Sequence, residues 1–151
     1  MTAELPEPWP RERYPVVHRI PTRWADNDHY GHVNNVVYYE WFDTAVNRTL
    51  IERAGCDVRE LSAIGLVVES GCRFLAPVSF PEAIDVGLVV DRIGRSSVTY
   101  RLAVFRVDDE GTPVAVGRFV HVYVDRDERR TMELPAEIRR GLEPISGAAM
   151  A

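Results

Sequence analysis

A long apolar segment near the start of the chain is the feature that most restricts its fold. Residues 36–54 carry apolar side chains at helical spacing, and further apolar residues widen that face. A helix that is apolar on most sides must be buried on most sides, as a curved sheet and a partner chain would do. Asn34 or Asn35 is the expected N-cap, and Gly55 the expected end. The apolar positions are Val36, Val37, Tyr38, Tyr39, Trp41, Phe42, Ala45, Val46 and Leu50.

Strand patterns occupy most of the remaining chain. A first strand is expected over residues 16–23, before the helix. The alternation after the helix indicates an antiparallel meander with one packed face, and a short helix is expected over residues 135–141. One buried helix against an antiparallel sheet of about five strands is an α+β architecture. Its exposed edges favour dimerisation. The four strands expected after the helix are 66–75, 84–93, 97–107 and 114–124.

Length and charge restrict the classes of partner. The 151 residues are 46% hydrophobic and 27% charged, which suits one domain, expected over 14–143. A proline-rich, flexible arm over 1–13 and a disordered tail over 144–151 are expected to flank it. The net charge of -5 argues against nucleic acid and anionic membranes, and no apolar run is long enough to span a bilayer. Cys56 and Cys72 lack metal-ligand spacing, so we expect reduced thiols, no metal and a cytoplasmic location.

A dense polar run, residues 26–35, connects the first strand to the long helix. It holds two acids, two histidines and three asparagines within ten residues. A helix N-terminus presents unpaired N–H groups and the positive end of the helix dipole. A carboxylate such as Asp28 could act there as base or nucleophile on a carbonyl polarised by those groups. The alternative is a turn and N-cap cluster, in which these residue types are ordinary.

The run resembles the signature of hotdog-fold acyl thioesterases. Residues 23–35, Arg-Trp-Ala-Asp-Asn-Asp-His-Tyr-Gly-His-Val-Asn-Asn, carry the resemblance together with the tyrosines at 38 and 39. The 4-hydroxybenzoyl-CoA thioesterase family is the most similar, and plant acyl-ACP thioesterases share the acid-x-acid and His-Val-Asn-Asn strings. Similarity extends over residues 15–142, including Gly-Arg-Ser-Ser at 94–97.

The resemblance implies a hotdog fold, in which a curved antiparallel sheet wraps a long helix. It further implies a homodimer or homotetramer with sites at the dimer interface. No metal or redox cofactor is implied, because coenzyme A is part of the substrate.

The resemblance also implies catalytic roles for four residues of the run. Asp28 matches the catalytic carboxylate, as nucleophile or as the base that activates water. The backbone N–H of Asn35 would hold the developing oxyanion. His32 would act directly or orient another group, and Asn34 would position water or stabilise the loop. Plant relatives have asparagine where this chain has Tyr30, so a full Asp-Asn-His arrangement is not implied.

Five further residues are candidates for substrate binding, each with a structural alternative. Tyr30 follows the acid pair, and Tyr38 would shape an acyl tunnel or fill the core. Glu69 would reach the site from the partner chain or would face outward from its strand. Arg95 and Ser96, in a turn, would meet the phosphates of coenzyme A or form part of a solvated face.

The expected reaction is hydrolysis of an acyl-CoA thioester to a free acid and coenzyme A. One alternative is a hotdog enoyl-CoA hydratase, which the resemblance ranks lower because no Asp-x-Asn-Pro-x-His pattern occurs. A non-catalytic acyl-CoA-binding protein and an acyl-ACP thioesterase are the others. The lack of a Gly-x-Ser-x-Gly elbow disfavours a Ser-His-Asp hydrolase.

Overall fold

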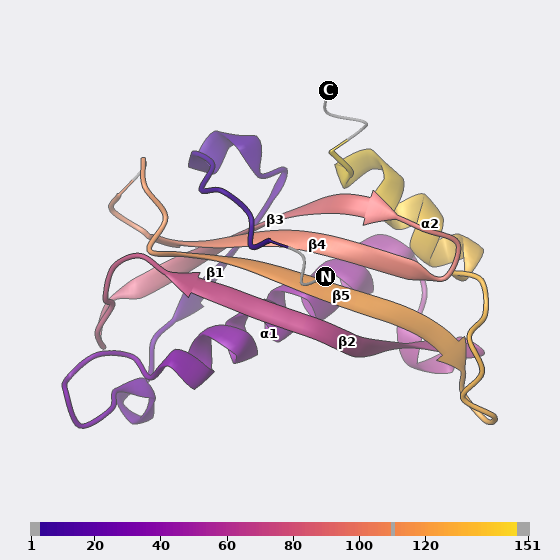
Figure 1. Cartoon of the computed structure of the whole chain (residues 1–151), viewed down its shortest axis with the longest axis horizontal. Coiled ribbons are helices and arrows are strands. Elements are labelled where there is room, and N and C mark those ends of the chain that lie inside the picture. The colour runs from indigo at the N-terminus through magenta and orange to yellow at the C-terminus, as the bar shows by residue number, and fades with distance from the viewer. Residues whose placement is uncertain (1–3, 110, 148–151) are drawn as a thin grey trace.

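The computed structural model describes residues 4–109 and 111–147 and contains one five-stranded antiparallel sheet (Figure 1). The strands lie in the order β1-β3-β4-β5-β2. The three central strands are buried at nearly every position, so both of their faces are covered, whereas the sequence pattern predicted one packed face. The strand bounds are β1 Val16–Pro21, β2 Ala63–Phe74, β3 Ala83–Ile93, β4 Ser97–Arg106 and β5 Ala115–Asp125.

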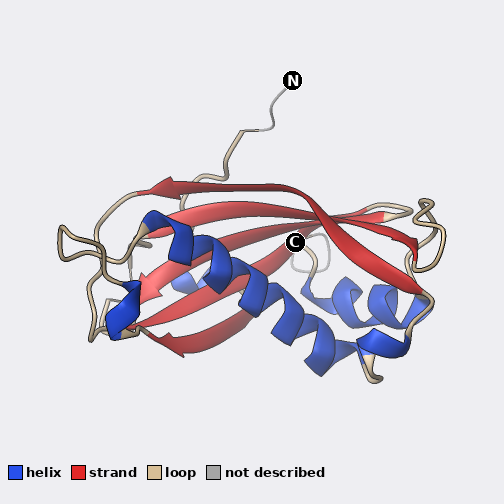
Figure 2. Ribbon diagram, turned by 90° about the horizontal axis from the view of Figure 1, so that it is seen from below, coloured by secondary structure: helices blue, strands red, loops and turns tan. Residues whose placement is uncertain are grey.

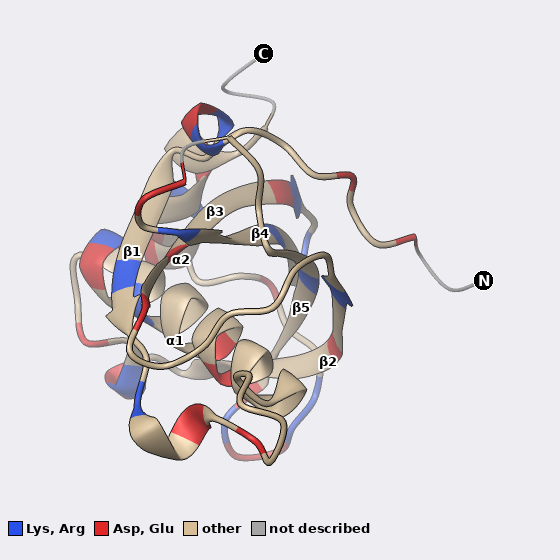
Figure 3. Ribbon diagram, turned by 90° about the vertical axis from the view of Figure 1, so that its left-hand side faces the viewer, with Lys and Arg blue, Asp and Glu red and all other residues tan. Residues whose placement is uncertain are grey.

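The long helix α1, Asn35–Ala54, lies in the concave side of the sheet, which curves around it (Figures 2 and 3). The Asn34 side chain caps it by accepting a hydrogen bond from the N–H of Val36, and Gly55 ends it in the left-handed conformation. Phe42, whose exposed fraction is 0%, lies at the centre of the core. The α+β arrangement of one long helix and a curved five-stranded sheet confirms the prediction.

The order of the strands differs from a simple meander after the helix. Only β3, β4 and β5 are consecutive neighbours, while β2 pairs with β5 and β1 pairs with β3. Because α1 follows β1 and precedes β2, it carries the chain across the concave face from one edge strand to the other (Figure 2). The result is a sheet whose two edges are β1 and β2.

A second, smaller apolar cluster lies on the outer face of the sheet, opposite α1. It contains Tyr14 and Phe105, with Trp9 packed against them. The guanidinium groups of Arg13 and Arg101 lie 3.8 and 3.7 Å from the centroid of the Trp9 ring. Residues 4–13 of the expected arm therefore contact the sheet, and residues 1–3 lie outside the described residues.

The C-terminal helix α2, Ala136–Leu142, packs against α1. A short 3-10 helix, Glu143–Ile145, follows it, and Ile145 is buried. The N–H of Gly147 donates to the carbonyl of Val90 at 2.7 Å, so residues 144–147 of the expected tail contact the domain. Residues 148–151 lie outside the described part of the chain. None of the described helices has the length and apolar content needed to cross a membrane.

Candidate active site

The loop between β1 and α1 is held at both ends by buried contacts. Asp26 is 1% exposed, and its carboxylate accepts hydrogen bonds from the backbone N–H of Arg23 at 2.8 Å and from that residue's Nε at 2.9 Å. The N–H of Asn34 donates to the carbonyl of Asp26 at 2.8 Å, and Val33 donates to Val78 at 2.7 Å. These bonds fix the positions of the residues between Asp26 and Asn34.

Asp28 lies in the middle of this loop, and one of its two carboxylate oxygens accepts hydrogen bonds from the loop backbone. Its Oδ1 accepts from the backbone N–H groups of Tyr30 at 2.8 Å and His32 at 3.4 Å. Gly31 turns the chain at φ 85°, which favours glycine. No described residue hydrogen-bonds to Oδ2. The loop therefore orients a half-buried carboxylate and leaves one of its oxygens available.

The start of α1 provides a free hydrogen-bond donor beside this loop. The cap uses the N–H of Val36, which donates to Oδ1 of Asn34 at 3.1 Å, and Val37 donates to the carbonyl of Asn34 at 3.0 Å. The N–H of Asn35 has no partner among the described residues. A free N–H at the positive end of a 20-residue helix is suited to stabilise an oxyanion.

A groove of about 320 Å³ lies beside the start of α1, and we call it the helix-start groove. It brings together three of the predicted site residues, His32, Asn35 and Tyr38, with Phe74 from the end of β2. Tyr38 is 3% exposed, and burial raises the pKa of its phenol to about 12. Its ring packs at 5.0 Å from that of Phe74, so Tyr38 forms both core and groove wall. The remaining lining residues are Val33, Leu75, Ala76 and Pro77.

Four predicted substrate-binding residues do not line this groove. The Tyr30 side chain is exposed. Glu69 forms an ion pair with Arg118 at 2.8 Å on the outer face, across the sheet from α1. Arg95 and Ser96 follow the far end of β3, about 30 Å along that strand from its start beside the end of β1. Arg95 pairs there with Glu133 at 3.2 Å.

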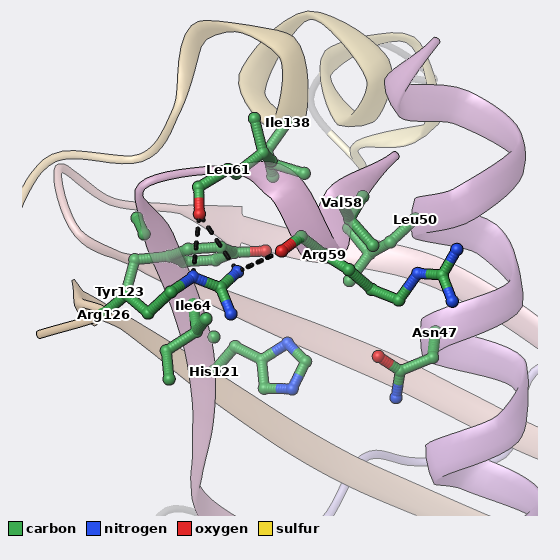
Figure 4. A pocket seen from close by; sticks show the side chains of 12 residues that line it. Asn47, Leu50, Val58, Arg59, Leu61, Ile64, His121, Tyr123, Arg126 and Ile138 are labelled. Carbon is green, nitrogen blue, oxygen red and sulfur yellow. Dashed lines mark hydrogen bonds between the residues drawn. The ribbon is translucent and has the colours of Figure 1, made fainter. Parts of the chain in front are cut away.

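A second cavity, of about 220 Å³, lies between the C-terminal half of α1 and the sheet (Figure 4). Asn47, His121 and Tyr123 line it, and none of the three was among the site residues predicted from the sequence. The position of His121 in its strand could have indicated it. His121 lies two residues from both Phe119 and Tyr123, whose side chains face the core, so it lies on the same face of the strand. We call this space the His121 cavity. The described residues contain no group of three or more metal-ligating side chains.

Comparison with known proteins places this geometry in a family. The model of the Thioesterase-like superfamily matches residues 22–142. No curated protein matches the chain.

Solved structures are similar over most of the chain. The PA5185 protein from Pseudomonas aeruginosa strain PAO1 is 50% identical, with a TM-score of 0.88 over 93% of this chain and 97% of that one. A hypothetical protein, TT1821, from Thermus thermophilus is 29% identical, with a TM-score of 0.74 over 85% and 98%. A thioesterase from Thermus thermophilus, complexed with coenzyme A and Zn, is 28% identical, with a TM-score of 0.72 over 86% and 98%. The fold is the hotdog fold, and the chain belongs to the Thioesterase-like superfamily.

Proposed function

We propose that this protein hydrolyses acyl-CoA thioesters to a free acid and coenzyme A. The observation that carries the proposal is the presence of two groups within one short segment, the loop that leads into α1 and the first residue of that helix. Asp28 has an oriented carboxylate with one free oxygen, and Asn35 has a free backbone N–H. A nucleophile or base together with a preorganised oxyanion donor is the combination that acyl transfer requires.

Asp28 initiates the reaction in this proposal. Its free oxygen either attacks the thioester carbon directly or removes a proton from a water that attacks it. The carbonyl oxygen becomes an oxyanion, which the N–H of Asn35 stabilises. The carbon–sulfur bond then breaks, and the thiolate of coenzyme A leaves and takes up a proton that comes from the water. If Asp28 is the nucleophile, an acyl–Asp28 anhydride remains, and water hydrolyses it to the free acid and the Asp28 carboxylate. His32, which lines the helix-start groove with Asn35, positions the water or the carbonyl.

The edge strand β2 supports assembly into a homodimer with sites at the interface. Its side chains Val67 and Val68 are 48% and 59% exposed, and Phe74 at its end is 46% exposed. An exposed apolar edge strand is an open template for pairing with another chain. Antiparallel pairing of two β2 strands about a two-fold axis would cover this edge in both subunits. A tetramer would form by further contact between dimers.

Coenzyme A is the proposed carrier of the acyl group. The similar Thermus thermophilus thioesterase was solved with coenzyme A. The net charge of -5 is unfavourable for docking an acyl carrier protein, which is itself acidic. No resident metal or redox cofactor takes part in this proposal, since a carboxylate and a backbone amide provide the chemistry.

The proposal is tested by measuring release of free thiol from a panel of acyl-CoA thioesters. Asp28→Asn keeps the Oδ1 acceptor that orders the loop and removes the charge. We expect it to lower kcat by a factor of about 10³ or more, because it abolishes the nucleophile or base. Asp127→Asn, at an exposed turn, is the matched control and should retain wild-type turnover.

Three results would contradict the proposal. Full turnover by Asp28→Asn would exclude Asp28 as the reacting carboxylate. Absence of thiol release from every thioester, with acyl-CoA binding intact, would favour a binding protein. Hydration of an enoyl-CoA without thiol release would favour a hydratase.

A further inference from the structure

Residues 78–80, between β2 and β3, hold the Asp28 loop in place, and we use that name for residues 26–34. Each of the three residues makes one hydrogen bond to the loop, and these bonds reach it both before and after Asp28. Two segments that lie far apart in the chain are thereby joined into one unit. The bonds run from the Val33 N–H to the Val78 carbonyl at 2.7 Å, from the Ser79 hydroxyl to the Gly31 carbonyl at 2.7 Å, and from the Phe80 N–H to Oδ1 of Asn27 at 3.0 Å.

The bond from Ser79 acts on a peptide group that orients Asp28. The carbonyl of Gly31, which accepts this bond, and the N–H of His32 belong to the same planar peptide unit. That N–H donates to Oδ1 of Asp28 at 3.4 Å. A hydroxyl that fixes the carbonyl end of a rigid unit also fixes the direction of its N–H end. The Ser79 hydroxyl therefore controls one of the two backbone N–H groups that hold the Asp28 carboxylate.

The same bond strengthens the weaker of these two contacts. At 3.4 Å the bond from His32 to Asp28 is longer than an ordinary N–H···O bond, whereas the bond from Tyr30, at 2.8 Å, is not. Hydrogen bonds in a chain polarise one another, so a donor on the Gly31 carbonyl makes the His32 N–H a better donor. The Ser79 hydroxyl therefore acts where the orientation of the carboxylate is least secure.

Ser79 is itself fixed by contacts with other residues. Its N–H donates to Oε2 of Glu82 at 2.8 Å, and the N–H of Glu82 donates to the carbonyl of Ser79 at 2.9 Å. The other carboxylate oxygen of Glu82 accepts from Nε of Arg106, at the end of β4, at 2.9 Å. The hydroxyl therefore extends from a backbone that is tied to the sheet. A donor held in this way can fix the loop, whereas a mobile donor would move with it.

The segment that carries Ser79 also forms a wall of the site. Residues 75–77 directly precede Val78, and they line the helix-start groove together with His32 and Asn35. Ser79 is not among the residues that line this groove. Its influence on a thioester in the groove therefore passes through the Asp28 loop, and it makes no contact of its own with the reacting atoms.

We infer that Ser79 is a positioning residue, which acts through the peptide unit between Gly31 and His32 to aim the free oxygen of Asp28. The inference rests on the proposed function, in which that oxygen attacks the thioester or activates water. Ser79 changes the direction of the reacting oxygen and leaves the lining of the groove unaltered. Its effect is therefore on kcat rather than on KM.

Steady-state kinetics of Ser79→Ala test this effect, with the acyl-CoA thioester that the wild type hydrolyses fastest. We expect kcat to fall about tenfold to a hundredfold, with less than about a twofold change in KM. Ser79→Thr retains the hydroxyl and should keep kcat within about threefold of the wild type. Ser62→Ala is the matched control and should retain wild-type kcat, because it removes an exposed hydroxyl just before β2, at the end of that strand opposite to the groove.

Three kinetic results overturn the inference. The first is an unchanged kcat in Ser79→Ala, and the second is a raised KM with kcat unaltered, which would place Ser79 in binding. The third is an equal loss of kcat in Ser79→Ala and Ser79→Thr, which would show that the hydroxyl is not the cause. Thermal unfolding of each variant accompanies the kinetics, and a midpoint within about 2 °C of the wild type shows that the fold is retained.

NMR of the 15N-labelled protein follows the same hydrogen bonds without turnover. The amide protons of Tyr30 and His32 should shift as Asp28 ionises, and the part of each shift that Asp28→Asn abolishes belongs to that carboxylate. Ser79→Ala should reduce this part by about half or more for His32 and should leave it nearly unchanged for Tyr30. A His32 shift of wild-type size in Ser79→Ala overturns the inference, whatever the kinetics show.

The two measurements separate the inference from the proposed function. If the wild type releases no thiol from any thioester but the His32 shift depends on Ser79, the proposed hydrolysis fails and the orientation of Asp28 by Ser79 stands. If Asp28→Asn lowers kcat while Ser79→Ala changes neither kcat nor the His32 shift, Asp28 is the reacting carboxylate and Ser79 does not position it.

Discussion

Gly117 on β5 lies directly against the ring of Phe42 on α1. A Cβ built at Gly117 would lie 2.4 Å from Cε2 and 2.6 Å from Cζ of that ring. The ring is fully buried, so it has no free space in which to move aside. This contact sets how closely the helix approaches the sheet.

Gly117→Ala should therefore destabilise the protein by overpacking the core. We expect a loss of about 1–3 kcal/mol in the free energy of unfolding, measured by urea denaturation. Gly111→Ala is the control, because Gly111 lies in an exposed turn where the nearest heavy atom is 4.0 Å from the added Cβ. It should change the free energy of unfolding little. Wild-type stability in Gly117→Ala would mean that α1 moves freely relative to β5.

Removal of the helix cap should affect both stability and catalysis. Asn34→Ala deletes the oxygen that accepts from Val36, which costs about 1 kcal/mol of stability. The adjacent N–H of Asn35 loses its fixed orientation, so kcat should fall about tenfold if that group stabilises an oxyanion. Asn34→Ser retains a capping oxygen and should preserve most of the stability and most of kcat. Stability is measured by thermal unfolding and kcat by thiol release, and a loss of stability with unchanged kcat would separate Asn35 from the chemistry.

His121 should make the protein sensitive to mild acid. Burial lowers the pKa of His121 to about 4, while the unfolded side chain titrates near its ordinary value of about 6.5. The unfolded state therefore binds more protons between these values, so stability is complete above pH 6.5 and falls as the pH drops towards 4. The difference in pKa corresponds to about 3 kcal/mol. Urea unfolding at pH 7.5 and pH 4 should show that loss in the wild type beyond the loss in His121→Gln, and equal losses would contradict the buried neutral imidazole.

Trp9 should hold the N-terminal segment against the outer face. Its ring lies between the guanidinium groups of Arg13 and Arg101, so Trp9→Ala loses two cation–π contacts and apolar burial, together about 2 kcal/mol. We also expect trypsin to cleave at Arg11 and Arg13 faster in the variant. Trp24→Ala, whose side chain is 76% exposed, is the control. Unchanged cleavage in Trp9→Ala would show that other contacts hold the segment.

The sequence by itself determined the local elements of this protein. Helical spacing predicted a helix over residues 36–54, and α1 spans Asn35–Ala54. Its cap is Asn34, one of the two predicted caps, and it ends at Gly55 as predicted. These features depend on neighbours within one or two turns, so a single sequence contains the information. The motif around Asp28 also identified the thioesterase relationship, which the superfamily match supports.

The tertiary structure alone decided which side chains share a face. An extra residue, Val68, interrupts the pairing of β2 with β5. Val67 pairs with His121 on the α1 side, whereas Glu69 pairs with Val120 and lies on the outer face. Strict alternation would have placed Glu69 on the same side as Val67, towards the site. A one-residue change in register reverses the face of every later side chain, and only contact with the neighbouring strand fixes it.

The His121 cavity also depends on contacts between distant segments. Asn47 from α1, Gly65 from β2 and His121 from β5 meet only after β2 has paired with β5 beneath the helix. Gly65 permits this approach, because a Cβ there would lie 3.1 Å from the His121 ring. The strand patterns predicted a sheet but not its order, since periodicity specifies which face of a strand is buried and not which strand lies beside it. The Asp28 loop is a local motif that sequence reveals, whereas a pocket assembled from three separate elements is a product of topology.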